Sequence, residues 1–172
     1  MQDEIVSRLA CTLGYQLAIA EARRAERSPH PDAMDLIFQA KACLWLGNNP
    51  QNFIKARDLY ERALPIDDRN VGALVSTAFL DLMRGTTLLT DEPTAFFSAA
   101  ETNLIKALSL APDDSNAHCI LGCVYILTNR AIQGIAECEH ALRLNRNLAA
   151  AAHGTIGAGN IVWVNLRRRN AM

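Results

Sequence analysis

Two cysteines and a histidine in the middle of the chain have the side chains best suited to bind a metal ion. Cys119 and Cys123 stand four residues apart, which puts both thiols on one face of a helix. Two thiolates leave a zinc site incomplete, and on a helix His118 projects about 100 degrees away from Cys119. We therefore expect His118 to be packed in the interior and the chain to hold no metal. A redox pair is a weaker alternative, because a helix holds neighbouring turns too rigidly for an easy disulfide.

The sequence lacks the common signatures of catalysis. It has no phosphate-binding loop, no H-E-x-x-H and no G-x-S-x-G motif. A catalytic site needs a nucleophile, a base and an orienting group that converge in one pocket. We therefore predict that the protein is not an enzyme and uses no cofactor.

The composition predicts a folded protein with little affinity for nucleic acid or membranes. Half of the 172 residues are apolar, and 17 Lys and Arg nearly balance 18 Asp and Glu. No apolar run reaches the roughly 18 residues that a membrane span needs, and Asp3 and Glu4 stand where a secretory signal would be basic. The expected location is the cytoplasm. Five cysteines, an odd number without a C-x-x-C pair, favour reduced thiols in the core.

A repeated pattern identifies the elements that would hold these side chains. The clearest unit runs from 115 to 148, and the stretch before it ends in the same way about 34 residues earlier. The two endings are Ala107-Leu108-x-Leu110 and Ala141-Leu142-x-Leu144. The clearest unit reads His118-x-x-Leu121-Gly122-x-x-Tyr125, followed by Gly134, Cys138 and Ala141.

This unit resembles the tetratricopeptide repeat, whose pattern is W-x2-L-G-x2-Y, A-x3-F and P. The sequence departs from the pattern at four positions: His118 replaces the tryptophan, Gly134 the alanine, Cys138 the aromatic residue and Arg146 the proline. The resemblance covers residues 32 to 157. It implies an all-α fold, a right-handed α-solenoid of about eight helices arranged as hairpins.

The small residues have a physical role in this pattern. Leu121 and Tyr125 share a helix face, and Gly122 has no side chain to hold the second helix of the hairpin away. We expect Gly122 to pair with Ala141 in one hairpin, and Ala78 with Ala107 in the hairpin before it.

The predicted organisation has three parts. An amino-terminal capping helix lies within 1–31, and an incomplete fourth repeat with a basic tail occupies 149–172. Between them, helices are expected near 32–46, 51–64, 71–84 and 91–110, with an insertion of about ten residues around 85–93. The three complete hairpins are then 32–67, 68–114 and 115–148.

By resemblance, the first helices of the hairpins line a concave groove that binds another protein. Its lining is strongly apolar, and only Lys41 and Asn116 are polar, which suits an amphipathic helix better than the acidic carboxyl terminus of a heat-shock chaperone. An alternative is that some of these residues are simply core or are covered by the long first helix. The predicted groove residues are Ile37, Lys41, Leu44, Trp45, Val75, Phe79, Leu82, Met83, Asn116, Cys119, Cys123, Ile126 and Leu127.

Two further functions are left open by the sequence. The incomplete last repeat would expose an apolar face for homodimerisation, formed by Ile156, Ile161, Val162, Trp163 and Leu166. A small ligand near Cys119 and Cys123 is the other alternative. Repeats with long turns also resemble regulatory segments beside bacterial signalling domains, which suggests a regulatory or scaffolding context.

Overall fold

The computed structural model describes residues 13, 16–17, 19–24, 32–45, 50–86 and 92–148. These residues form helices, turns and short links, and no strand occurs among them. The predicted all-α fold class is confirmed for this part of the chain. The chain divides into two units, Met1–Asp68 and Arg69–Met172, and each is treated by itself below.

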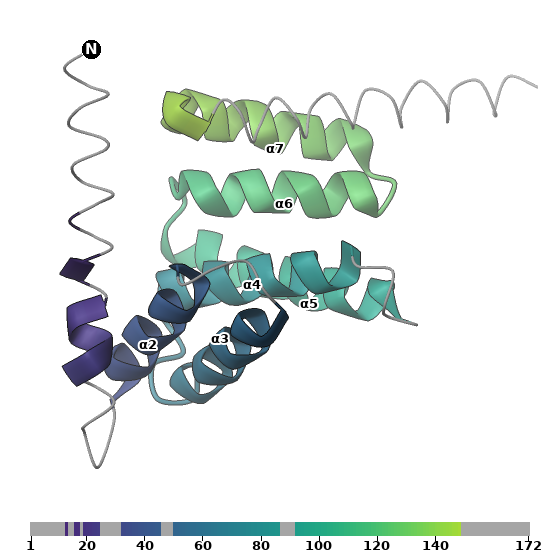
Figure 1. Ribbon diagram of the computed structural model, residues 1–172. Coiled ribbons are helices and arrows are strands. Elements are labelled where there is room, and N and C mark those ends of the chain that lie inside the picture. Colours follow the sequence, from purple (N-terminus) through teal and green to yellow (C-terminus); the bar gives the residue numbers. More distant parts are fainter. Residues whose placement is uncertain are drawn as a thin grey trace, which may run out of the picture. The chain divides into compact units, whose positions relative to one another are not determined.

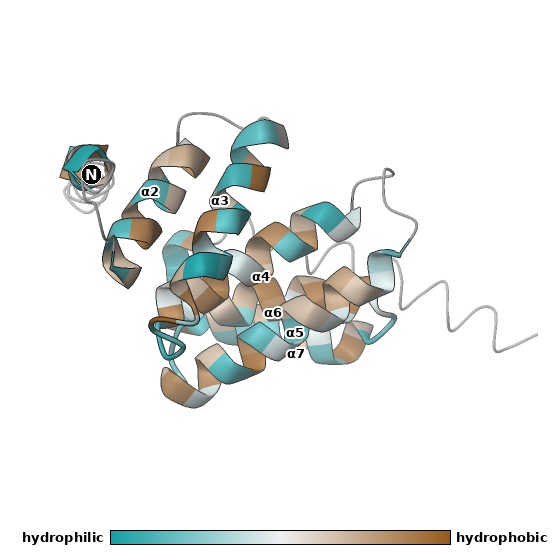
Figure 2. Ribbon diagram, turned by 90° about the horizontal axis from the view of Figure 1, so that it is seen from below, coloured by the Kyte–Doolittle hydropathy of each residue, from teal (hydrophilic) through white to brown (hydrophobic). Residues whose placement is uncertain are grey.

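In the first unit, helices α2 (Ala33–Trp45) and α3 (Pro50–Ala63) pack against each other (Figure 1). Asp32 and Asp35 cap the start of α2 reciprocally, since each carboxylate accepts a hydrogen bond from the other residue's backbone N–H, at 2.8 and 3.2 Å. Both helices carry apolar and polar residues (Figure 2), and their apolar faces are buried. The predicted bounds of both helices are confirmed to within a residue.

The second unit consists of two helical hairpins. Helix α4 packs on α5, α6 packs on α7, and α6 also contacts both helices of the preceding hairpin (Figure 1). A short 3-10 helix, η1, follows α7 and packs against it. The bounds are Val71–Thr86 for α4, Pro93–Leu110 for α5, Ser115–Leu127 for α6, Ala131–Leu144 for α7 and Arg146–Leu148 for η1.

The two first helices of this unit, α4 and α6, repeat each other residue by residue at a separation of 44. Their first ten positions, 71–80 and 115–124, have the same degree of burial at every step. Asn70 and Asp114 cap them in the same way, with side-chain oxygens that accept from the N–H three residues later at 3.0 and 2.8 Å. Equal capping and equal burial indicate two copies of one structural unit.

The second helices, α5 and α7, repeat at a separation of 34. All four buried positions of α7 coincide with those of α5. Both helices also end alike, because the backbone N–H of Ala111 donates to Ala107 O and that of Asn145 donates to Ala141 O, each at 2.8 Å. The coinciding pairs are Phe97 with Ala131, Ala100 with Gly134, Leu104 with Cys138 and Ala107 with Ala141.

The predicted ten-residue insertion does not form one long loop. Compared with the last hairpin, α4 is three residues longer than α6 and α5 is four residues longer than α7. Residues 87–91, between these two helices, lie outside the described part of the chain. Helix α5 begins at Pro93, two residues after the predicted start at 91, and proline suits the first helical position. Most of the insertion therefore lengthens the helices.

Gly122 lies where the backbones of α6 and α7 approach most closely. A Cβ atom at Gly122 would overlap the Cys138 sulfur and come within 2.8 Å of Gly134 O. A Cβ at Gly134 would come within 2.6 Å of Gly122 O. The prediction of a close approach at Gly122 is correct, but the expected partner Ala141 is wrong. In an antiparallel hairpin with its turn at 128–130, residues equally far from the turn meet, and Ala141 lies too far along α7.

This contact predicts different outcomes for two glycine substitutions. Gly122→Ala should lower the free energy of unfolding by about 1–3 kcal/mol, because the new methyl group meets backbone atoms that cannot easily move away. Gly72→Ala is the matched control, since its Cβ would meet only Asn70 Oδ1, at 3.5 Å, and it should be neutral or slightly stabilising. Urea unfolding followed by circular dichroism measures both, and equal stabilities would contradict the close contact.

Candidate functional site

The structure divides the predicted groove residues of the second unit into two groups. Val75, Leu82, Cys119 and Ile126 are at most 8% exposed and offer almost no surface to a partner. The residues at 79, 83 and 123 are half-buried, and Leu127 is 46% exposed. Asn116 is exposed at the amino-terminal end of α6. Phe79, Met83, Cys123 and Leu127 therefore remain as an accessible set, here called the apolar strip.

The apolar strip occupies equivalent positions on the two first helices. Phe79 and Met83 are one turn apart on α4, and Cys123 and Leu127 occupy the equivalent positions on α6. Helices α4 and α6 are in contact, so the two halves of the strip lie on neighbouring helices. In the first unit, Ile37 is buried while Lys41 and Leu44 are half-buried. The side chain of Trp45 lies outside the described part, as do all five residues predicted for the dimer face.

A backbone motif at the end of α6 holds an arginine in place. Asn129 adopts a left-handed conformation, with φ of 63°, and the chain closes a Schellman motif. The Arg130 N–H donates to Tyr125 O at 2.7 Å and the Asn129 N–H donates to Ile126 O at 3.2 Å. The Arg130 guanidinium lies over the Tyr125 ring, 4.3 Å from its centroid, and donates to Thr128 Oγ1.

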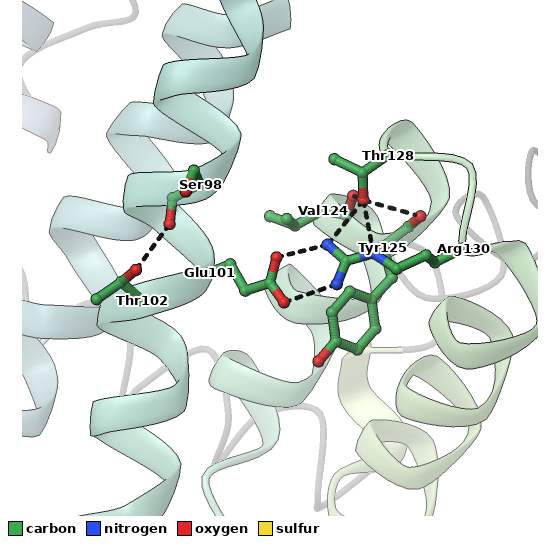
Figure 3. Close-up of polar contacts among 7 residues, drawn as sticks. All are labelled: Ser98, Glu101, Thr102, Val124, Tyr125, Thr128 and Arg130. Carbon is green, nitrogen blue, oxygen red and sulfur yellow. Dashed lines mark hydrogen bonds and ion pairs between the residues drawn. The ribbon is translucent and has the colours of Figure 1, made fainter.

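From this position Arg130 reaches the preceding hairpin (Figure 3). Its two terminal nitrogens donate to the two oxygens of Glu101 on α5, at 2.7 and 2.5 Å. The two side chains are only 35% and 24% exposed, so water screens this bidentate pair incompletely. We call Glu101, Tyr125, Thr128 and Arg130 the polar lock, because it joins α5 to the turn between α6 and α7.

The polar lock shifts the titration of its members. The hydrogen-bonded guanidinium of Arg130 lowers the pKa of the Glu101 carboxyl, an effect larger than the opposing one of desolvation. The same hydrogen bond raises the pKa of Arg130. The pKa of Tyr125 is raised, first by desolvation and then by the negative charge of Glu101. The lock therefore consists of fully charged Glu101 and Arg130 beside a neutral phenol at neutral pH.

His118 is packed in the interior, as the sequence predicted. It is 8% exposed, and its Nδ1 lies 2.5 Å from a Glu137 oxygen on α7. Its Nε2 lies 2.8 Å from Pro112 O in the link before α6, and its ring stacks on His140 with centroids 4.3 Å apart. Both ring nitrogens face protein acceptors, which ties three elements of the unit together.

Three thiols meet beside the contact between α6 and α7. Cys119 and Cys138 are buried together with Ala141, and Cys119 forms a hydrogen bond with Cys123. None of the four cysteines at 43, 119, 123 and 138 is in a disulfide. Within the described ranges, no group of three or more His, Cys, Asp and Glu residues is arranged to hold a metal ion.

Sequence reasoning missed the polar lock and the meeting of Cys138 with the other thiols. Glu101 and Arg130 are 29 residues apart, and no local pattern links them. The asparagine after α6 was a usable signal, because asparagine often ends a helix in the left-handed conformation and thereby fixes the position of the next residue.

No protein-family model and no curated protein sequence matches this chain. Among the helices that the structure describes, none combines the length and the apolar character that a membrane crossing requires.

The polar lock predicts an acid-dependent loss of stability. Because the pKa of Glu101 is lower in the folded state, the ion pair stabilises the fold above the unfolded-state pKa, and this stabilisation disappears as pH falls through the folded-state pKa. Glu101→Gln should therefore lower the free energy of unfolding by roughly 0.5–1 kcal/mol at neutral pH and by less in acid.

Urea unfolding at a series of pH values measures this difference. Glu139→Gln on the exposed side of α7 is the matched control, and it should change stability little at any pH. If Glu101→Gln lowers the free energy of unfolding by the same amount down to strongly acidic pH, the charge of the carboxylate does not contribute to stability.

Proposed function

We propose that this protein is a non-catalytic binding module that resembles tetratricopeptide repeats and takes up an amphipathic helix on its apolar strip. The observation that carries the proposal is the recurrence of half-exposed apolar side chains at equivalent positions of α4 and α6. Apolar side chains gathered on neighbouring helices are a common feature of surfaces that bind another protein. The proposal includes a right-handed solenoid in which further hairpins extend the same surface.

The repetition of the two hairpins supports a scaffold of this kind. Identical caps at Asn70 and Asp114 begin α4 and α6 in the same register, so equivalent side chains project in equivalent directions. The polar lock then fixes the turn between α6 and α7 against α5. A rigid surface loses little conformational entropy when it binds, which favours affinity.

The side chains on the strip indicate the chemistry of the partner. Phe79, Met83 and Leu127 offer apolar and flexible contacts, which suit leucine, methionine or aromatic anchors spaced three and four residues apart on a helix. With a net charge of −1, the chain has no strong field for a highly charged ligand. Shape and apolar contact would then decide affinity.

The internal contacts of His118 argue against its use as a catalytic base. A general base must have a nitrogen that can reach a substrate proton. In this protein both His118 nitrogens face Glu137 and Pro112 O, and the ring is buried. Its contacts serve the fold of the second unit.

Selection from a displayed library of helix-forming peptides tests the proposal. Peptides with apolar residues at three- and four-residue spacing should be enriched, and Leu127→Glu should weaken the best of them at least tenfold, about 1.4 kcal/mol. Phe79→Glu should act in the same direction. Isothermal titration calorimetry measures the dissociation constants, and far-UV circular dichroism checks that each variant is folded.

The matched control is Ile105→Glu on α5, which replaces an isoleucine that is 52% exposed outside the apolar strip. This variant should bind the selected peptide as the unaltered protein does. Equal losses in Leu127→Glu and Ile105→Glu, or selected peptides without the helical spacing, would contradict the proposal.

A further inference from the structure

The thiol pair of α6, Cys119 and Cys123, forms a small site that shares Cys123 with the apolar strip. Cys119 and Cys123 lie one helical turn apart and are joined by a hydrogen bond, so their sulfur atoms already face each other. Cys119 is 7% exposed, whereas Cys123 is half-buried and gives access from the surface. Of the two thiols, Cys123 is therefore the one that a ligand from solution reaches first.

The protonation state of the two thiols decides which ligand suits this pair. A divalent metal binds thiolates and must displace the thiol protons. The hydrogen bond with Cys123 raises the pKa of Cys119, and burial raises it further, while burial raises the pKa of Cys138 to about 12. Ionising this cluster is costly, and no metal-binding set of three ligands is present among the described residues. Zinc and similar ions are therefore poor ligands for it.

Trivalent arsenic reacts with thiols in a different way. An arsenical R–As=O condenses with two S–H groups, forming two As–S bonds while its oxygen leaves as water with both thiol protons. Arsenic stays trivalent, the sulfurs are not oxidised, and no proton is released to solvent. A pair of protonated, adjacent thiols is the arrangement that this condensation needs.

From the paired sulfurs and their one-sided access, we infer that Cys119 and Cys123 bind a monosubstituted trivalent arsenical as a dithiol site. Two sulfurs complete the three bonds of the arsenic atom, and the organic substituent points outward past Cys123. The sulfur of Cys138 does not bind the arsenic atom, because Cys138 is fully buried on α7. The inference does not depend on the proposed binding of a helix.

Phenylarsine oxide added to the folded full-length chain tests the inference. Native mass spectrometry should show one adduct, with the mass of the reagent less one water. Cys123→Ser should abolish the adduct, and so should Cys119→Ser. Cys138→Ser and Cys43→Ser are the controls and should retain it, and an excess of 2,3-dimercaptopropanol should remove it from all proteins that carry it.

Far-UV circular dichroism shows whether each variant is folded. Cys123→Ser is the decisive variant if Cys119→Ser fails to fold, because Cys123 is half-buried and its replacement disturbs the core less. The inference is overturned if the unaltered protein takes up no reagent, if folded Cys123→Ser keeps the adduct, or if folded Cys138→Ser loses it.

Discussion

The second unit depends on the direct approach of two helix backbones at Gly122 and Gly134. With no side chain at either position, a carbonyl oxygen of each glycine comes within 2.8 Å of the space where the other's Cβ would stand. Such contacts allow weak Cα–H···O interactions and a tight helix pair. They also determine which side chain lies beside Gly122, because the sulfur of Cys138 fills that space. The gathering of the thiols is thus a consequence of the close helix contact.

The polar lock joins this hairpin to the preceding one. The Schellman motif at Asn129 fixes the backbone of Arg130, and the ring of Tyr125 supports its guanidinium from below. The bidentate pair with Glu101 then joins the turn after α6 to α5 of the preceding hairpin. Backbone, aromatic and ionic interactions act together here to hold the turn between α6 and α7 against α5.

Helix α6 carries residues of both the apolar strip and the thiol pair. The turn that carries Leu127 presents an apolar surface, and the turns before it carry the thiol pair that faces α7. Cys123 belongs to both, because it is half-buried between the interior and the surface. A change in the packing of α6 on α7 would alter the surface and the thiols together.

The sequence alone determined the helices, because their signals are local. The spacing of Leu121, Gly122 and Tyr125, proline at the start of α5 and the repeated Ala-Leu-x-Leu endings predicted the elements and their pairing into hairpins. Only the tertiary structure decided that Gly122 meets Gly134, that Val75 and Cys119 are buried while Phe79 and Leu127 are accessible, and that Arg130 pairs with Glu101. The physical reason is that periodicity fixes the face of a helix, whereas the partner of each side chain depends on the register between helices. Turn geometry and close backbone contacts set that register.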